Sequence, residues 1–241
     1  MVPPWQAGRM PGAVWAAAAT ERIDPSSWLV LATGVVAALA VVVDGMWRWT
    51  RGVVTIAHEA GHAVAALATG RRLTGIRLHS DTSGLTLSVG KPTGAGMVVT
   101  AAAGYVSPSL VGLAGVALLA VDRVTVMLWA AAAVLVAMLV MVRNWYGALS
   151  LLVTGGVVVA VSVYGSEGAQ AAFAYVMTWF LLLGGVRPVA ELRRQRRYQP
   201  GLPTDADILA RLTRVPGSLW VALFGLATLA ALGGGGWLLL T

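Results

Sequence analysis

Apolar residues in this chain gather in long runs that short polar segments separate, and this pattern predicts an all-α polytopic membrane protein. Each run approaches the roughly twenty residues that a helix needs to cross the hydrocarbon core of a bilayer. The runs cover residues 28–46, 52–70, 95–120, 124–142, 145–164, 168–186 and 217–239. The sequence therefore predicts about seven transmembrane helices. The span at 145–164 contains glycines, which permit a broken or partly re-entrant helix there.

A short stretch between the second and third runs has a different period. Residues 76–78 and 85–89 alternate apolar and polar side chains on either side of a polar turn that ends at Gly84. Such alternation predicts a small β-hairpin directly after the second run. If one edge of this hairpin is unpaired, it is a template for an extended peptide. The simpler interpretation is a surface hairpin that caps the spans.

Composition limits the classes of protein and of cofactor. Hydrophobic residues make up 58% of the chain and charged residues 11%, which excludes a soluble globular domain. The chain has no cysteine, so disulfides, iron–sulfur centres and cysteine-bound zinc are excluded, and any metal must be held by histidine and oxygen ligands. The net charge of +7 comes from basic loops that meet anionic lipid headgroups. The lipid bilayer is therefore an expected partner, and nucleic acid is not.

The basic residues also predict an orientation, because cytoplasmic loops are enriched in Lys and Arg. If the arginine-rich loop 187–216 is cytoplasmic, the alternation of seven spans places residues 1–27 and 71–94 inside as well. Only three of the 17 Lys and Arg residues then lie outside: Arg48, Arg51 and Arg123. The expected N-terminus is cytoplasmic and the expected C-terminus is external. The preference for Arg over Lys indicates a GC-rich bacterial genome, and hence the cytoplasmic membrane of a bacterium.

These segments define the expected domain organisation. Residues 1–27, which contain several prolines, form a cytoplasmic tail. Residues 28–241 form one membrane-embedded domain, with its core at 47–165, the cytoplasmic loop at 187–216 and the last span at 217–239. The core contains all 3 histidines of the chain.

Two of these histidines belong to the motif His58-Glu59-Ala60-Gly61-His62. Histidines at this spacing lie on one face of a helix, where both imidazoles can bind one zinc ion, and Glu59 beside them can act as a general base. The alternative is a pair of imidazoles that hydrogen-bond between helices without a metal. An ionisable side chain near the centre of a membrane helix costs roughly 2.5–3.5 kcal/mol, which a metal would offset. The motif therefore favours zinc, with His58 and His62 as ligands.

Three pieces of the chain together resemble the site-2 protease family of intramembrane zinc metalloproteases, in particular its small bacterial branch. They are the motif within residues 56–63, the hairpin within 76–89, and the segment Ala102-Ala103-Gly104-Tyr105 followed by Pro108. The last piece is similar to the A-G-P signature of the family, with Tyr105 in the place of proline. This resemblance implies a zinc cofactor and the cleavage of a transmembrane protein substrate within the bilayer, near its cytosolic side.

Members of this family usually complete the zinc shell with an aspartate in an L-D-G motif on a later span, and this chain contains no such motif. Asp205, in the segment Thr204-Asp205-Ala206-Asp207, resembles an S-D-A segment of the small branch and is the first candidate for the third ligand. The other interpretation of this segment is a capping box between Thr204 and Asp207 at a helix N-terminus.

Other groups are alternative candidates for the third ligand. Asp81 lies near His79 on the hairpin, where a turn residue is the simpler interpretation. Asn144 is the nearest polar group in the region of the missing motif, although a neutral amide is a poorer zinc ligand than a carboxylate. Glu191 and Asp44 are interpreted as loop and interface charges. Water or a substrate group could also complete a site with only the histidine ligands.

The sequence as a whole predicts a zinc-dependent intramembrane endopeptidase with Glu59 as the general base. Its expected metal ligands are His58, His62 and Asp205. Two other classes remain open: a catalytically silent membrane scaffold of the same fold, and a small transporter in which the His and Glu side chains relay protons. Zinc content separates these classes, since a protease retains about one zinc ion per chain and a proton relay does not.

Overall fold

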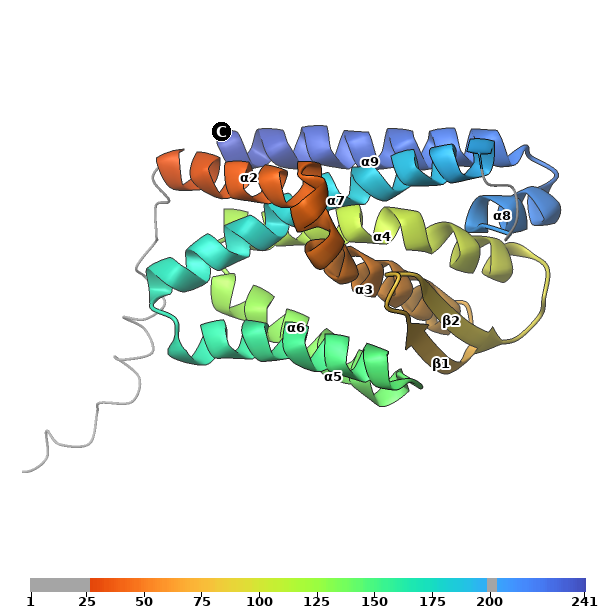
Figure 1. Ribbon diagram of the computed structural model, residues 1–241, viewed down its shortest axis with the longest axis horizontal. Helices are drawn as coiled ribbons and strands as arrows, with labels where there is room; N and C mark the ends of the chain where they lie inside the picture. The colour runs from red at the N-terminus through yellow and green to blue at the C-terminus, as the bar shows by residue number, and fades with distance from the viewer. Residues whose placement is uncertain (1–26, 199–202) are drawn as a thin grey trace, which may run out of the picture.

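The computed structural model describes residues 27–198 and 203–241, and within them the chain forms eight α-helices and one two-stranded sheet (Figure 1). The elements are, in chain order, α2 (Ser27–Val42), α3 (Asp44–Ala68), β1 (Arg72–Leu78), β2 (Gly84–Val89), α4 (Ala95–Ala120), α5 (Val124–Met141), α6 (Trp145–Tyr164), α7 (Glu167–Tyr198), α8 (Asp205–Thr213) and α9 (Gly217–Leu240). The helical architecture and the hairpin after the motif helix are confirmed. The predicted tail 1–27 lies outside the described residues, except for Ser27.

In residues 27–198 and 203–241, fewer helices are long and apolar enough to cross a membrane than the seven that the apolar runs predict. Within the described residues, 5 helices are each long and apolar enough to cross a bilayer: α4, α5, α6, α7 and α9. The helices α2 and α3 pass that test only as a pair, bent by 99° at the break between them, so this part of the chain has up to 6 spans. The first apolar run ends as a helix at Val42, after 16 residues. The second run belongs to a helix that begins at Asp44 and carries Arg48, Arg51 and the motif, and this helix is too polar to count as a span alone.

Two further segments differ from the expectation. The predicted cytoplasmic loop 187–216 is largely helical in its described part, because α7 continues to Tyr198 and α8 follows. The helix α6 runs without a break through Gly155 and Gly156, so it is a regular span and not a re-entrant segment.

Arg187 of α7 ties the break between α2 and α3 to the rest of the bundle. Val43 has an extended backbone, with φ −76° and ψ 114°, and this interrupts the helix and leaves the last carbonyls of α2 without helical partners. The Arg187 guanidinium donates hydrogen bonds to the carbonyls of Val41 and Val42. It also pairs with the carboxylate of Asp44. The arginine therefore stabilises the bend by binding both helices at once.

Glu191, one turn further along α7, extends this network. Its carboxylate accepts hydrogen bonds from Arg187 Nε at 3.2 Å and from Trp47 Nε1 at 2.8 Å, and it pairs with Arg51 at 3.4 Å. Asp44 and Glu191 therefore lie in ion pairs that join α3 to α7, and neither is a loop charge.

The helices pack as one bundle in which α4 and α7 are central (Figure 1). The helix α4 contacts α3, α7 and α9, and α7 also contacts α2 and α9, whereas α5 and α6 form a pair beside them. Helices α3 and α4 approach each other closely at Gly61, where a Cβ atom would overlap the side chain of Ser107. Small residues of this kind let membrane helices come into backbone contact. The motif helix and the segment around Gly104 are thereby brought face to face.

The two strands of the hairpin pair antiparallel, and only one outer edge of this sheet is free within the described chain. The other edge, that of β1, is covered because Ile76 forms a bridge with Val142. The side chain of Asn144 also binds both backbone groups of Leu78, at 3.2 Å and 2.6 Å. The edge of β2 has no strand partner among the described residues.

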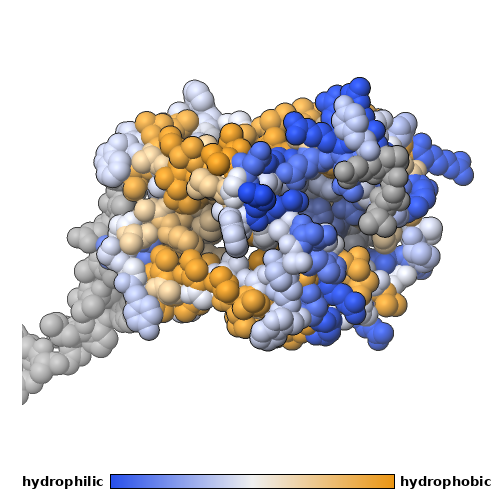
Figure 2. Space-filling view, in the orientation of Figure 1, coloured by the Kyte–Doolittle hydropathy of each residue, from blue (hydrophilic) through white to orange (hydrophobic). Residues whose placement is uncertain are grey.

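Polar and apolar surfaces separate along the long axis of the molecule (Figure 2). Apolar side chains gather over the left of this view, and hydrophilic side chains gather over the right, where the hairpin, α8 and the end of α7 lie. The helix α2 begins, and α9 ends, at the end of the molecule opposite to the hairpin. With six spans, Ser27 and Thr241 would lie on the same side of the membrane, whereas seven spans predict opposite sides.

Candidate metal centre

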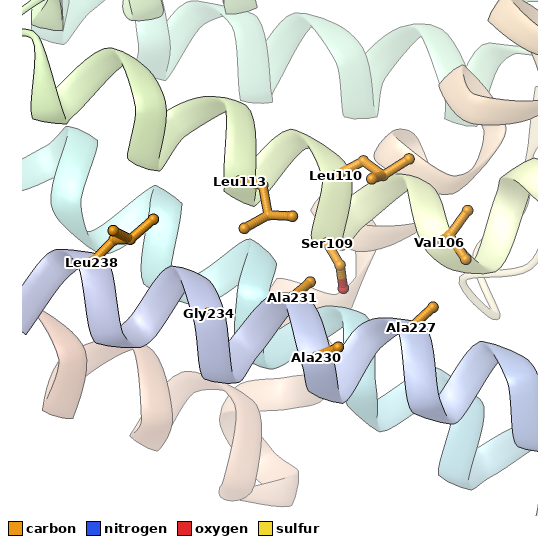
Figure 3. Close-up of a pocket in the computed structure, with 9 residues that line it drawn as sticks. All are labelled: Val106, Ser109, Leu110, Leu113, Ala227, Ala230, Ala231, Gly234 and Leu238. Atoms are coloured by element: carbon orange, nitrogen blue, oxygen red, sulfur yellow. The ribbon is translucent and has the colours of Figure 1, made fainter.

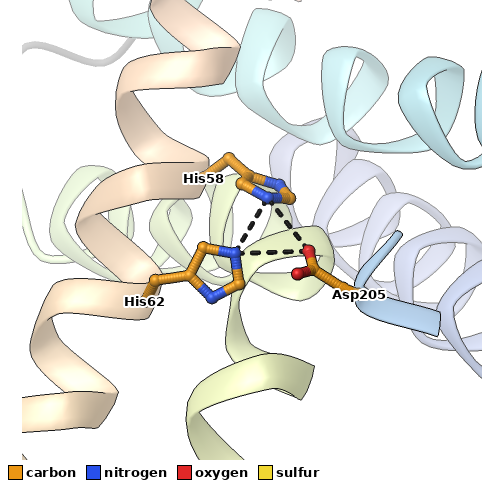
Figure 4. A group of neighbouring side chains, drawn as sticks. All are labelled: His58, His62 and Asp205. Atoms are coloured by element: carbon orange, nitrogen blue, oxygen red, sulfur yellow. Dashed lines mark hydrogen bonds and ion pairs between the residues drawn. The ribbon is translucent and has the colours of Figure 1, made fainter. Parts of the chain in front are cut away.

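The side chains of His58, His62 and Asp205 converge between α3 and α8 (Figure 4). His58 and His62 lie one turn apart on α3, and their Nε2 atoms are 3.0 Å apart. Asp205, the first residue of α8, places its Oδ2 atom 3.4 Å from Nε2 of His58 and 3.3 Å from Nε2 of His62. The structure thus brings together both histidines of the motif and the first candidate for the third ligand.

These three atoms fit a tetrahedral zinc ion. Ligand atoms that bind zinc at about 2.0–2.2 Å with tetrahedral angles lie about 3.3–3.6 Å from one another. The separations here, 3.0, 3.4 and 3.3 Å, lie at or slightly below that range. Two imidazoles and one carboxylate are also a donor set that catalytic zinc sites use, with a fourth position left for water or substrate. The group could therefore hold a zinc ion.

Helix α4 orients His62 and makes room for both imidazoles. The Nδ1–H group of His62 donates a hydrogen bond to the carbonyl oxygen of Thr100 at 2.7 Å, which leaves the lone pair of Nε2 directed at the centre. Gly104 lies directly behind the two rings, since a Cβ atom there would overlap Nε2 of both His58 and His62. Only glycine leaves this space open.

Tyr105, which stands where the family signature has proline, forms one wall of the centre. Its ring lies edge-on to the ring of His58, with centroids 4.8 Å apart and an interplanar angle of 88°. On its other side it stacks on Phe224 of α9, with centroids 5.2 Å apart. The departure from the signature therefore connects the last span to a candidate metal ligand.

The segment that contains Asp205 fits both interpretations of the sequence, because it forms a helix cap and also presents Asp205 to the histidines. Thr204 and Asp207 form a capping box, in which the carboxylate of Asp207 accepts hydrogen bonds from the backbone and hydroxyl groups of Thr204 at 3.0 Å and 2.6 Å. Arg196 of α7 pairs with Asp207. The cap leaves Asp205 free to face the histidines, and the fully buried Leu209 docks α8 on the bundle.

Asp205 is suited to act as an anionic ligand. Burial disfavours its charged form, but His58 and His62 outweigh this effect when their Nε2 atoms carry protons, through hydrogen bonds and charge, and hold the pKa of Asp205 well below its ordinary range. A metal ligand of this type must be ionised.

The alternative third ligands lie elsewhere. Asp81 occupies the exposed turn of the hairpin, where its carboxylate accepts hydrogen bonds from the backbone and hydroxyl groups of Ser83 at 2.9 Å and 2.7 Å. These bonds lower the pKa of Asp81. Asn144 is engaged with the backbone of Leu78. Neither Asp81 nor Asn144 belongs to the group formed by His58, His62 and Asp205.

Glu59 lies between the motif helix and the hairpin, and only 3% of its surface is exposed. Its Oε2 atom accepts a hydrogen bond of 2.6 Å from the hydroxyl group of Thr86 in β2. The backbone of Gly84 passes so close that a Cβ atom there would overlap the carboxylate. Thr55 of α3 also donates to the carbonyl of Thr82 at 2.8 Å, so the hairpin is fastened to the helix beside Glu59.

The sequence interpretation missed two residues that hold this centre, Thr86 and Thr100. The alternation in 85–89 places Thr86 on the face opposite to Leu85 and Leu87, and a polar side chain on the inner face of a hairpin was the available signal. Thr100 acts through its backbone carbonyl, for which side-chain identity carries no signal.

The comparison with known families identifies the class of this protein. A family model described as Peptidase M50B-like matches residues 31–235, which is most of the chain. The chain therefore belongs to this family, and the resemblance to the site-2 proteases is confirmed. It matches no curated protein and no solved structure.

Proposed function

We propose that this protein is a zinc-dependent intramembrane endopeptidase that cleaves a transmembrane protein substrate near the cytosolic side of the bilayer. The observation that carries the proposal is the convergence of His58, His62 and Asp205, in a chain of the Peptidase M50B-like family, at distances that suit zinc. Their proposed role is to hold the metal ion. When bound, zinc supplies Lewis acidity, which lowers the pKa of water to about 7 and polarises a carbonyl group.

Glu59 is the proposed general base. Its carboxylate accepts the proton of the attacking water and delivers it to the leaving amide nitrogen. The hydroxyl group of Thr86 holds Oε2 of Glu59, and this contact orients the carboxylate on the buried side of the hairpin. Burial of Glu59 among α3 and β2 also keeps bulk water away from it.

A transmembrane substrate must leave its helical form before a peptide bond can enter such a site, because helical backbone groups are bonded within the segment. The free edge of β2 is the proposed support for the extended form, through backbone hydrogen bonds. This strand lies directly against Glu59, and its outward side chains Leu85, Leu87 and Val89 are exposed. An extended substrate at this edge would lie beside the general base.

The proposed location is the cytoplasmic membrane of a bacterium, with the hairpin and α8 on the cytoplasmic side and the C-terminus outside. The concentration of arginines at the end of α7 supports this orientation. The count of spans decides the side of the N-terminal tail: seven spans predict a cytoplasmic tail, whereas six place Ser27 outside with Thr241. We favour six, because α2 and α3 qualify only as one bent span.

A silent scaffold and a proton relay are less consistent with this arrangement. The scaffold was considered because the chain lacks the L-D-G aspartate, and Asp205 offers a carboxylate in its place. A proton relay has no need for two imidazole nitrogens and a carboxylate at zinc-ligand spacing.

The test is zinc content measured together with cleavage of a reconstituted single-span membrane protein. Wild-type protein should contain about one zinc ion per chain, and Glu59→Gln should keep this zinc and lose cleavage, because only the base is removed. His62→Ala should lose both zinc and cleavage. Wild-type protein without zinc, or cleavage by Glu59→Gln at the wild-type rate, would contradict the proposal.

A further inference from the structure

The N-terminus of α8, which presents Asp205 to the histidines, is bound by an arginine of another helix. Arg196, in the last turn of α7, donates a hydrogen bond of 3.2 Å to Oγ1 of Thr204 and pairs with the carboxylate of Asp207. Thr204 directly precedes Asp205 in the chain, and Asp207 lies two positions after it. The two groups that bind the guanidinium therefore flank the candidate metal ligand.

The same guanidinium lies against the beginning of α9. Gly217, the first residue of this helix, is buried, and a Cβ atom there would lie 2.5 Å from Nη2 of Arg196. The N-terminus of a helix carries a partial positive charge, so a cation at this place is unfavourable for α9. The contacts with α8 explain its position, because Asp207 offsets the charge of Arg196 and the capping box orients Asp207.

The buried apolar residues of α8 lie on one face of this short helix. Ala206 and Leu209 are fully buried, in a cluster that also contains Ala101 of α4, Leu192 of α7 and Phe224 of α9. Residues three positions apart share one side of a helix, so these contacts fix how closely α8 approaches the bundle. The direction of its first turn depends on further contacts, and those of Arg196 lie at the end of α8 that carries Asp205.

Beyond this cluster the packing between α4 and α9 is incomplete. A groove of about 390 Å³ lies between the two helices, lined by residues of α4 between positions 106 and 113 and of α9 between positions 227 and 238 (Figure 3). Ala101 and Phe224 precede these segments in their helices, so the cluster and the groove follow each other along the bundle. The beginning of α9 is therefore joined to α7 and α8 by the cluster and by Arg196.

We propose that Arg196 is a positioning residue for the third metal ligand. By binding Thr204 and Asp207 it fixes the first turn of α8, so that Oδ2 of Asp205 lies 3.4 Å from Nε2 of His58 and 3.3 Å from Nε2 of His62. Bonds from zinc to its ligands tolerate deviations of only about 0.2 Å, so a small displacement of this turn weakens the site. The inference rests on the proposed metal centre and not on turnover, and its readout is metal binding.

The test is a double-mutant cycle on zinc affinity, measured on the full-length protein in detergent by competition with a chromophoric chelator. Arg196→Gln should weaken zinc binding by about tenfold or more, as expected on loss of a group that orients a ligand. Arg194→Gln is the matched control and should bind zinc as wild-type protein does, because Arg194 is an exposed residue of the same helix. In the Asp205→Ala background, Arg196→Gln should cause no further loss, since Arg196 acts through that ligand.

Cobalt provides a second readout, which separates positioning from a general loss of structure. The absorption of bound Co²⁺ reports the number and geometry of its ligands. The cobalt spectrum of Arg196→Gln should shift toward that of Asp205→Ala, whereas Arg194→Gln should keep the wild-type spectrum. Arg196→Lys keeps the charge without the planar fork of donors and should bind zinc with intermediate affinity. If Arg196→Gln does not fold, Arg196→Lys takes its place in the cycle.

Two results would overturn the inference while leaving the metal centre intact. One is wild-type zinc affinity and an unchanged cobalt spectrum in Arg196→Gln. The other is an equal further loss of affinity when Arg196→Gln is added to Asp205→Ala, which would show that Arg196 acts independently of that ligand. Wild-type protein that binds neither zinc nor cobalt would reject the metal centre itself, and the role of Arg196 with it.

Discussion

Thr86 of β2 donates a hydrogen bond of 2.6 Å to the carboxylate of Glu59 on α3, so the hairpin and the proposed general base form one unit. The same hydroxyl group lies 3.2 Å from the carbonyl oxygen of Glu59. A strand that holds the base and also presents a free edge can position the extended substrate and the carboxylate together.

Replacing Thr86 with valine should lower the cleavage rate without loss of zinc. Valine keeps the β-branched shape and removes only the hydroxyl group that orients Glu59. We expect the cleavage rate to fall by about tenfold, which is less than the loss expected on removing the general base itself. Thr86→Ser should retain most activity. Thr74→Val is a matched control, because that hydroxyl bonds the carbonyl of Leu87. Equal activity of Thr86→Val and wild type would reject this role.

Replacing Gly104 with alanine should weaken metal binding while the protein stays folded. The added methyl group would occupy the space where Nε2 of His58 and His62 lie, so both rings must shift. We expect zinc affinity to fall by about tenfold or more, as for damage to the support of a metal ligand. Gly156→Ala on α6 is the control, because a Cβ atom there meets nothing within 4 Å. Unchanged zinc affinity in Gly104→Ala would show that the rings do not need this space.

Replacing Arg187 with glutamine should destabilise the junction of α2 and α3. The change leaves the carbonyls of Val41 and Val42 and the carboxylate of Glu191 with fewer partners. Such losses cost about 1–3 kcal/mol in partly buried positions, which thermal unfolding in detergent can measure. Arg193→Gln, at an exposed position of the same helix, should have little effect. Similar unfolding temperatures for both variants would argue against the network as the stabiliser of the bend.

The termini should lie on the same side of the membrane. Six spans require this arrangement, and the beginning of α2 and the end of α9 lie at the same end of the molecule (Figure 1). Reporters fused at the N-terminus and after Thr241 should therefore both be external, and a reporter within 199–202 should be cytoplasmic. Reporters of opposite sidedness at the two termini would restore the seven-span prediction.

Hydropathy predicts α5 and α6 well because the limits of these helices coincide with the limits of apolar runs. The run 124–142 corresponds to α5 (Val124–Met141), and the run 145–164 corresponds to α6 (Trp145–Tyr164). The break at Val43 could not be predicted in this way, since Arg187 stabilises it from a distant part of the chain. The runs 28–46 and 52–70 each have a suitable length, so hydropathy alone predicts two spans where α2 and α3 qualify only as one bent pair.

The same distinction applies to the candidate site. The spacing of His58, Glu59 and His62 within one helical turn is local, and the sequence displays it directly. Asp205 comes from a short helix near the other end of the chain, and only a resemblance pointed to it. Because Thr204 and Asp207 explain that segment as a helix cap, local chemistry alone favoured the capping box. The fold contains both, because the cap supports the helix that presents Asp205 to the histidines.

The most direct test of the account is the zinc affinity of Asp205→Ala compared with that of Asp81→Ala, measured by competition with a chromophoric chelator. The account predicts that Asp205→Ala binds zinc at least about 10-fold more weakly than wild-type protein, because it loses one of three protein ligands. Asp81→Ala should bind zinc as wild-type protein does, since Asp81 only bonds Ser83 on the exposed turn. Full zinc affinity in Asp205→Ala would contradict the assignment of His58, His62 and Asp205 as the metal centre.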